Sequence, residues 1–284
     1  IKKSNQRIIY ASISGFGRVG PHASRGAMDM IAQASSGIMS VVGAPDKVPK
    51  VALGDYLSGV YAALGIFMAL RYRDKTGKGQ WIDVSMQDVL FHANFRAFGM
   101  LMPWETVEGW RKEFGKQADL PAYGSFRAKD GYVAIVALSD SEWKRLLECV
   151  NKPELQKDER FKDLWSRLKH RDIIRKIIED WIKIKTAKEA EEELIKWRIP
   201  ASVVLDTDDV AKNPQIIARD MIREIAHPRL RRIKVPGVVL KLPESPGEIV
   251  TSAPNLGQHN NEVYSTLLGY SSEEIKKLKK ERII

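Results

Sequence analysis

The spacing of apolar positions changes twice in the first hundred residues, and these changes predict the order of the elements there. Residues 7–14 form a short apolar run, as expected for a buried strand, and residues 81–85 alternate apolar and polar positions like a second strand. Residues 29–39, the apolar stretch that follows Gly54, and residues 87–99 show helical spacing instead. The order strand, helix, helix, strand, helix is typical of part of an α/β layer domain.

The middle of the chain predicts a second, smaller domain of α+β type over residues 121–213. Residues 122–138 have the pattern of a β-hairpin whose turn lies at 128–131, with the sequence Ala-Lys-Asp-Gly. A charge-rich helical stretch follows at 141–198, and residues 200–205 form a short strand candidate. Hairpin, helices and strand together are enough to build a domain of their own.

The remaining boundaries follow from the same patterns. Residues 1–100 form a large α/β domain segment, residues 101–120 a linker, and residues 214–284 a return segment that ends in helices of the large domain. Within the return segment, residues 235–242 have the spacing of a strand. Residues 271–274, Ser-Ser-Glu-Glu, form a capping box that opens the last helix.

Charge and composition exclude one class of function. The chain has 284 residues, 44% of them hydrophobic, and a formal net charge of +10. Lysine and arginine alternate with acidic residues on the predicted helices, which is typical of solvated helix faces. The basic clusters at 229–232 and 276–280 have no aromatic residue beside them on which a base could stack. We therefore expect no nucleic acid among the partners.

The single cysteine, Cys149, excludes a disulfide within the chain. It lies in a helical pattern and is expected to be a buried, unreactive thiol, which fits a reducing compartment. The most apolar stretch, residues 60–70, is shorter than the ~20 residues that a membrane-spanning helix needs. The N-terminus lacks the basic, apolar and small-residue pattern of a signal peptide. These features predict a cytoplasmic protein without membrane contact.

Two common kinds of site have little support in the sequence. Residues 15–20 match the dinucleotide-binding pattern G-x-G-x-x-G after a strand. However, no periodic helix begins at the third glycine, and a second strand with a ribose-binding acid is missing, so a structural glycine turn is favoured. The five histidines are scattered without metal-ligand spacing, and no metal site is predicted.

Asp55 is the most informative position in the chain, because its carboxylate follows a glycine at the start of a predicted buried helix. Position alone favours a helix cap, the common role of aspartate at a helix start. The alternative is a nucleophilic carboxylate, which the helix dipole would keep ionised and whose neighbouring N–H groups would stabilise an oxyanion. Asp29 is likewise expected to cap its own helix, with a role in the site as the less favoured alternative.

Three blocks of glycine, aspartate and small residues follow one another in a fixed order along the chain: 14–20 with 25–37, 54–65 with 76–88, and 253–259 with 267–275. Each block is weakly specific alone, and the ordered set is specific. With these blocks, the chain from Ile8 to its end resembles the family III CoA-transferases, also called the CaiB/BaiF family. The match is dense through Asp88, sparse over 100–215 and dense again after 250.

The resemblance implies an acyl-CoA:carboxylate CoA-transferase in which Asp55 is the nucleophile. Attack on an acyl-CoA thioester would give a mixed anhydride, the returning CoA thiolate an aspartyl-CoA thioester, and an incoming carboxylic acid would then take the CoA. Coenzyme A is a substrate in this scheme, with no tightly bound cofactor and no metal, and the breadth of the family suggests succinyl-CoA as donor. The resemblance also implies the residues that contact acyl-CoA: Gly15, Phe16, Gly17, Arg25, Met28, Gly54, Met86 and Gln87.

Two departures from the family's pattern bear on the reaction. The racemase branch has a histidine where this chain has Met28, and methionine cannot carry a proton, which favours a transferase over the alternative α-methylacyl-CoA racemase or epimerase. Formyl-CoA members have a run of glycines in the small domain, whereas residues 116–126 contain Gly124 alone. A specificity for oxalate and formyl-CoA is therefore not expected.

The resemblance finally implies an assembly. Its fold would be a Rossmann-like large domain, present in part, and a smaller α+β domain, in an interlocked homodimer whose ring-like chains thread each other. Members of the family have a nucleotide-binding half that precedes the position of Arg7 and supplies many CoA contacts. Three alternatives follow: the chain is a fragment, it has a further N-terminal portion, or it is the second half of a split enzyme whose partner chain supplies this half. A non-catalytic CoA-binding subunit of a split enzyme is a further alternative.

Overall fold

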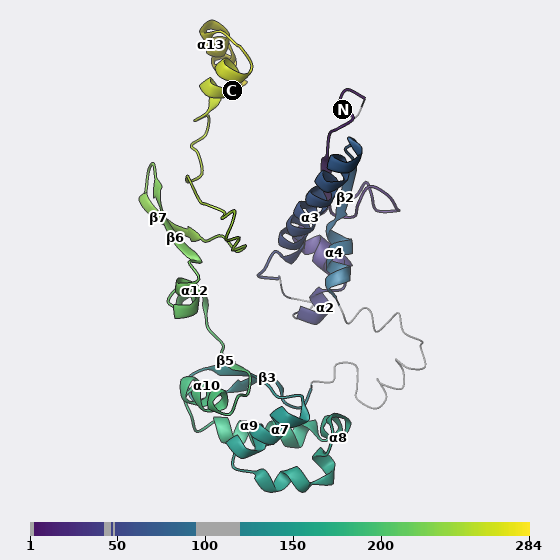
Figure 1. Ribbon diagram of the computed structural model, residues 1–284, viewed down its shortest axis with the longest axis vertical. Helices are drawn as coiled ribbons and strands as arrows, with labels where there is room; N and C mark the ends of the chain where they lie inside the picture. Colours follow the sequence, from purple (N-terminus) through teal and green to yellow (C-terminus); the bar gives the residue numbers. More distant parts are fainter. Residues whose placement is uncertain (1–2, 43–46, 48, 95–119) are drawn as a thin grey trace. The chain divides into compact units, whose positions relative to one another are not determined.

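The computed structural model describes residues 3–42, 47, 49–94 and 120–284 (Figure 1). The chain divides into two compact units, residues 1–118 and 119–284, and each is described by itself. Apart from Leu120, the predicted linker lies outside the described residues.

The N-terminal unit is a small α/β layer. Strands β1 (Tyr10–Ser14) and β2 (Trp81–Ser85) pair in parallel, from Tyr10 opposite Trp81 to Ser14 opposite Ser85. The predicted order of elements is confirmed, although the helix expected over 29–39 is split because Gly37 adopts a left-handed φ of 78°. The helices of this unit are α1 (Asp29–Ser35), α2 (Met39–Val42), α3 (Leu53–Thr76) and α4 (Met86–Ala93).

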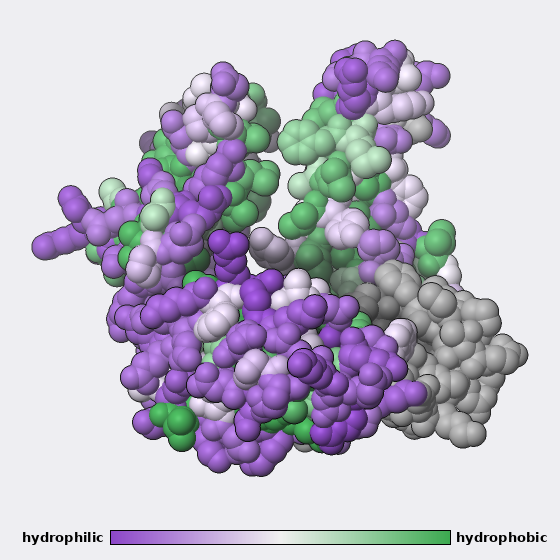
Figure 2. Space-filling view, turned by 60° about the horizontal axis from the view of Figure 1, so that its bottom comes forward, coloured by the Kyte–Doolittle hydropathy of each residue, from purple (hydrophilic) through white to green (hydrophobic). Residues whose placement is uncertain are grey.

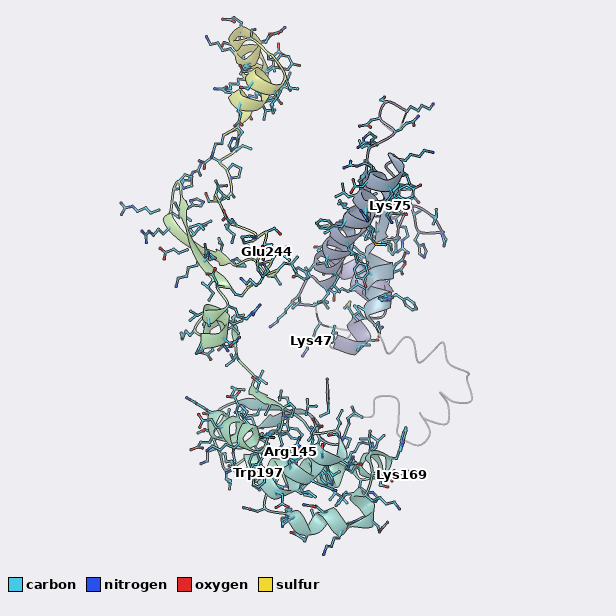
Figure 3. All side chains as sticks on the ribbon, viewed as in Figure 1. Lys47, Lys75, Arg145, Lys169, Trp197 and Glu244 are labelled. Carbon is cyan, nitrogen blue, oxygen red and sulfur yellow. The ribbon has the colours of Figure 1, made fainter. Side chains whose placement is uncertain are left out.

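Helix α3 is the main part of the crossover between the two parallel strands and packs on both of them, as well as on α1 and α4. It ends at Thr76, directly before a glycine. Gly77 is left-handed at φ 72°, and its N–H donates to the carbonyl of Arg73 at 2.8 Å. Arg73 and Lys75 in the last turn place positive charge against the helix dipole, and Lys75 is labelled in Figure 3.

Burial in this unit differs from the prediction. The sequence predicts a buried strand at 7–14, but in β1 only Ser12 is buried, because β2 is its one partner in the described structure. The predicted buried helix is likewise wrong for the outer face of α3. Small residues line its inner face and allow close packing, namely Gly54, Ser58, Ala62 and Ala69. Large apolar side chains point outward, namely Tyr56, Val60, Leu64, Phe67 and Met68.

Among the described residues, α3 is also the one helix long and apolar enough to cross a membrane. The apolar stretch at 60–70 is part of this longer helix, which begins at Leu53 and runs for 24 residues. Core helices of water-soluble proteins pass the same test, and α3 packs on two strands and two helices here. Length and composition alone do not assign it to a membrane.

The second unit contains an antiparallel sheet in the order β3 (Tyr123–Arg127), β4 (Tyr132–Val136), β5 (Ala201–Val203). The predicted hairpin, its turn and the late strand are confirmed. Its helices, also expected, are α7 (Asp140–Cys149), α8 (Leu164–Lys169), α9 (Arg171–Ile182) and α10 (Ala187–Lys196), with two short 3-10 turns, η1 (Pro153–Lys157) and η2 (Glu159–Phe161).

These elements, residues 120–205, enclose one continuous core and are called the small domain below. Helix α9 contributes Ile174, Ile178 and Ile182, which recur every fourth residue and are all buried. Helices α7 and α10 are joined where Arg145 donates to the carbonyl of Arg198, next to Trp197 (Figure 3). The outer surface of the small domain, brought forward in Figure 2, is mostly hydrophilic.

The last part of the chain holds a hairpin and two terminal helical segments. The strand predicted at 235–242 is correct only for its first two residues, because β7 ends at Pro236, which has no N–H to continue the ladder. The predicted capping box is confirmed between Ser271 and Glu274. The return of residues 214–284 to the large domain stays a prediction. The elements are α11 (Thr207–Val210), α12 (Pro214–Ala218), β6 (Ile222–His227), β7 (Arg231–Pro236), η3 (Glu262–Leu267) and α13 (Ser272–Lys280).

Candidate functional site

The glycine turn, α1, α3 and α4 meet at one end of the N-terminal unit. Six of the eight predicted acyl-CoA contacts lie on the turn, α3 and α4, and the other two, Arg25 and Met28, lie between the turn and α1. The backbone N–H of Gln87 donates to the carbonyl of Gly15 at 3.0 Å, and its side-chain amide donates to the carbonyl of Ser35 at 3.0 Å. The sulfur of Met86 lies 3.7 Å from the point that a Cβ on Gly54 would occupy. Segments more than thirty residues apart in sequence are thus held against one another.

The glycine turn at 15–20 is fixed by close packing and by a carboxylate from β2. A Cβ on Gly15 would collide with Ala27, and Gly17 is left-handed at φ 76°. The N–H of Arg18 donates to Asp83 at 2.9 Å. Among the described residues, no helix begins between the turn and Asp29, so the turn lacks the helix N-terminus that a dinucleotide needs, which supports the structural interpretation of this motif.

A small cluster of Arg25, His22 and Phe16 lies at this turn. The Arg25 guanidinium lies 5.3 Å from the centre of the buried Phe16 ring, and the His22 ring meets the same ring edge-on at 5.6 Å. Arg25 and Met28 are exposed. Sequence analysis missed His22, because a single histidine three residues before an arginine has no recognisable pattern.

Asp55 is the third residue of α3 and does not cap it. The helix begins at Leu53 after Ala52, whose side chain has no hydrogen-bonding group. Asp55 is exposed, and its carboxylate accepts no hydrogen bond from any residue that the structure describes. The role that position alone favours, a helix cap, is therefore not the one that Asp55 has.

Asp29 caps α3 instead, across 25 residues of sequence. Its Oδ1 accepts the N–H of Gly54 at 2.7 Å and that of Asp55 at 3.3 Å. Its Oδ2 accepts the side-chain amide of the buried Gln33 at 2.6 Å, and the same amide donates to the carbonyl of Val51 at 2.9 Å. The expectation that Asp29 caps its own helix is wrong: its side chain reaches a different helix, and α1 begins without a side-chain cap.

These hydrogen bonds decide what the start of α3 can do chemically. The N–H group of Leu53 donates to the carbonyl of Val51, and that of Tyr56 donates to the carbonyl of Ala52. The carboxylate of Asp29 accepts the N–H groups of Gly54 and Asp55, which lie between them in the sequence. The expected stabilisation of an oxyanion by this first turn is therefore wrong, because its donors are occupied. What remains is an exposed carboxylate at the start of α3, without a hydrogen-bond partner among the described residues.

Other reactive groups lie elsewhere in the chain. Cys149 is buried in the small domain as predicted, and burial raises the pKa of its thiol to about 12. Within the part of the chain that the structure describes, no three His, Cys, Asp or Glu side chains come close enough to hold a metal ion. Among the described residues of the N-terminal unit, Asp55 therefore combines an exposed, unbonded carboxylate with a position beside the predicted acyl-CoA contact Gly54.

The chain matches a family model described as CoA-transferase family III over residues 1–260. It is 32% identical over 292 residues to the succinyl-CoA–L-malate CoA-transferase alpha subunit of Chloroflexus aurantiacus, covering 100% of this chain and 67% of that protein. It is also 32% identical over 301 residues to the formyl-CoA:oxalate CoA-transferase of Streptomyces coelicolor, covering 100% of this chain and 73% of the relative. The chain therefore spans about two thirds of the length of such relatives.

Solved structures resemble it as well. Rv3272 from Mycobacterium tuberculosis superposes with a TM-score of 0.79 at 23% identity, covering 91% of this chain and 69% of that one, which shows the fold. A CaiB/BaiF family protein from Brucella suis gives a TM-score of 0.70 at 27% identity, covering 94% and 69%. From the family model and the identity to these relatives over its whole length, the chain belongs to the family III CoA-transferases.

Proposed function

We propose that this protein transfers coenzyme A from an acyl-CoA to a free carboxylic acid, with Asp55 as the nucleophile. The observation that carries the proposal is the state of the Asp55 carboxylate. It is exposed at the start of α3 and has no hydrogen-bond partner among the described residues, because Asp29 caps the helix in its place. Gly54 precedes it, and the Met86 sulfur lies 3.7 Å from the point that a Cβ on Gly54 would occupy. The residue after Met86, Gln87, is hydrogen-bonded to Gly15 of the glycine turn. Membership of the family supports the same reaction.

The proposed chemistry proceeds through two anhydrides and one thioester. A carboxylate oxygen of Asp55 attacks the thioester carbon, and the C–S bond breaks to release CoA thiolate and leave a mixed anhydride. The thiolate then attacks the Asp55 carbonyl and expels the donor acid as carboxylate. The acceptor carboxylate attacks this aspartyl-CoA thioester and releases the thiolate again. Attack of the thiolate on the acceptor's acyl carbon then gives the new acyl-CoA and restores Asp55.

Succinyl-CoA is the proposed donor and a short dicarboxylic acid the proposed acceptor. Two sets of relatives at 32% identity are named for transfer from succinyl-CoA to L-malate and to mesaconate. A formyl-CoA:oxalate transferase is equally similar in identity, so identity does not choose between the two. The scarcity of glycine at 116–126 supports the succinyl-CoA assignment. Phe16 and Arg25, which pack on each other beside the glycine turn, are proposed to face the acyl-CoA.

The active enzyme is proposed to contain more polypeptide than this chain, in a homodimer or with a partner chain. The outer face of α3 supports this, because Phe67, Tyr56 and Met68 are 70%, 65% and 64% exposed and form a continuous apolar stripe. Relatives of this chain are named as alpha and beta subunits of one CoA-transferase. A segment from further polypeptide that covers α3 would also complete the acyl-CoA pocket beside Asp55.

The direct test replaces Asp55 with asparagine in the complete, active enzyme. An amide cannot form the anhydride, so Asp55→Asn should fold normally and lose succinyl-CoA:carboxylate transfer by at least about 1,000-fold, equivalent to roughly 4 kcal/mol in the barrier. Hydroxylamine added to wild-type enzyme under turnover should modify Asp55 and no other carboxylate. Transfer that persists in Asp55→Asn, or an acyl group trapped elsewhere, would contradict the mechanism.

The same preparation separates the alternatives. A racemase would exchange the substrate α-proton with deuterium from the solvent, which transfer does not require, and Met28 offers no group to carry that proton. A non-catalytic CoA-binding subunit would show CoA-dependent stabilisation without transfer in any assembly. Transfer without α-proton exchange is the expected result.

A further inference from the structure

Asp29 stands at the centre of a set of hydrogen bonds that links α1 to the start of α3, and no chemical step of the proposed mechanism involves it. One carboxylate oxygen accepts hydrogen bonds from the N–H groups of Gly54 and Asp55, and the other accepts one from the side-chain amide of Gln33. Gln33 is completely buried, and its amide also holds the carbonyl of Val51, two residues before the helix begins. The segment that enters α3 and the first turn of α3 are therefore fixed to α1 by the same two side chains.

The chemistry of the partners determines how these groups are oriented. Asp29 and the Val51 carbonyl both accept hydrogen bonds, so the –NH₂ end of Gln33 must face them. That leaves the Gln33 carbonyl oxygen buried without a partner among the described residues, at a cost that this arrangement has to offset. A charge-assisted bond of 2.6 Å from Gln33 to Asp29 is the compensating contact.

Gly54 makes this approach of Asp29 possible. A Cβ at position 54 would lie 3.0 Å from the Asp29 carboxylate oxygen and 3.1 Å from Leu90, closer than ordinary van der Waals contact. The glycine before Asp55 therefore has a defined role, because it leaves room for an external carboxylate to reach the backbone N–H of residues 54 and 55.

Without Asp29, Asp55 would be the carboxylate nearest to the freed donors. An aspartate in the first turn of a helix readily accepts hydrogen bonds from N–H groups of that turn. Such bonds would occupy the lone pairs that the attack on a thioester needs. Because Asp29 accepts the hydrogen bonds of these N–H groups, the Asp55 carboxylate is not bonded to them.

We propose that Asp29 is a positioning residue for the nucleophile: it caps α3 from α1, aided by Gln33, and so keeps the Asp55 carboxylate out of the helix cap and available for attack. This inference rests on the proposed role of Asp55. It assigns to Asp29 no contact with substrate, so its removal should slow the acylation of Asp55 while substrate binding is little changed.

The test compares Asp29→Ala with Asp29→Asn in the complete, active enzyme, with succinyl-CoA as the probe. Asparagine keeps an oxygen that accepts from the N–H groups of Gly54 and Asp55. Its –NH₂ group then faces the –NH₂ group of Gln33, and two donors cannot bond to each other. We expect single-turnover acylation of Asp55, trapped with hydroxylamine, to fall at least about tenfold in Asp29→Ala and less than about threefold in Asp29→Asn, with KM for succinyl-CoA within about threefold of wild type in both. Acylation in Asp29→Ala within twofold of wild type, or equal loss in both variants, would overturn the proposal.

A second variant guards against failure of Asp29→Ala to fold. Gly54→Ala adds one methyl group at the point where Asp29 approaches, and alanine favours a helix over glycine. We expect it to fold, to slow acylation as Asp29→Ala does, and to speed amide hydrogen exchange at residues 54 and 55. Unchanged acylation and exchange in Gly54→Ala would also overturn the proposal.

The proposal and the function on which it rests fail in different ways. Wild-type enzyme without transfer to any acid, and without trapped acyl-Asp55, would contradict the proposed function and therefore remove the positioning role. Active wild-type enzyme whose Asp29 and Gly54 variants acylate at the wild-type rate would contradict the positioning role alone.

Discussion

The small domain and the N-terminal unit differ in how much of their apolar surface they bury. In the small domain, nineteen buried residues form one continuous cluster beneath a hydrophilic surface. Among the described residues of the N-terminal unit, the buried clusters contain four and three residues, and the large apolar side chains of α3 lie outside them. The small domain buries its apolar side chains within itself, whereas in the unit that carries Asp55 the outer apolar face of α3 is exposed.

This difference explains where chemistry can be placed. A closed core fixes its side chains and leaves little for a ligand, as the buried Cys149 with its raised pKa illustrates. The N-terminal unit instead fixes backbone, through the glycine turn, the Asp29 cap and the bond from Gln87 to Gly15, and leaves Asp55 exposed. A site completed by further polypeptide requires such an open face.

The largest expected effect comes from a matched pair of leucines, one in each region. Leu147 in the small domain is fully buried, while Leu64 on α3 is 56% exposed. Leu147→Ala should lower the free energy of unfolding by ~2–5 kcal/mol, and Leu64→Ala in the same chain should change it by less than ~0.5 kcal/mol. Urea unfolding followed by hydrogen exchange of peptides from each region measures both.

The Leu64 variant then sharpens the comparison. If further polypeptide covers α3 in the active enzyme, Leu64→Ala should weaken that assembly, with a raised subunit dissociation constant at unchanged stability of the chain. Equal destabilisation by the two leucine variants in the isolated chain would mean that α3 is already covered, and the contrast between the two regions would be lost.

A second pair, of glycines, separates the fixed backbone of the site from the outer face of α3. A Cβ on Gly15 collides with Ala27, whereas one on Gly59 meets nothing within 4 Å. Gly15→Ala should destabilise the N-terminal unit by ~1–3 kcal/mol through overpacking. Gly59→Ala should stabilise it by ~0.5–1 kcal/mol, because alanine loses less entropy in a helix. Thermal unfolding of both variants provides the measurement, and a stable Gly15→Ala would show that the glycine turn can shift.

Local signals in the sequence were sufficient for much of the fold. Strand β2 occupies 81–85 as its alternation predicts, and the hairpin turns at Asp130 and Gly131. The capping box at Ser271 and Glu274 is formed as expected, because its groups lie three residues apart. In each case the deciding contacts lie within a few residues, so a pattern of residue types is enough to specify them.

What the sequence could not predict depends on contacts between distant residues. The cap on α3 comes from Asp29, 25 residues before Gly54, and no local pattern distinguishes this from a cap on α1. The outward face of α3 has the same helical spacing as a buried face, so periodicity alone predicted that this face is buried. At the site, Gly15, Gly54, Met86 and Gln87 could be grouped from family resemblance, whereas the hydrogen bonds of Asp29 and Gln33 required coordinates.

The smallest expected effect concerns the pH dependence of the small domain, whose helices are capped by ionised carboxylates. The backbone N–H of Ser139 and the Ser139 hydroxyl hold the pKa of Glu142 below its ordinary value of 4.5, and Thr186 does the same for Glu189. A carboxyl whose pKa is lowered by folding stabilises the folded state above pH 4.5. That stabilisation is lost as the pH falls through the folded-state pKa.

We therefore expect the urea midpoint of the small domain to fall between pH 5 and pH 3, and to fall less in Glu142→Gln and Glu189→Gln. Glutamine still fits a capping box, so both variants should remain close to wild type at pH 7. Glu154→Gln is the matched control, because Glu154 belongs to no capping box and should leave the pH profile unchanged. A profile that all three variants share with wild type would show that these exposed caps do not contribute to closing the small domain, whose stability would then rest on its apolar core alone.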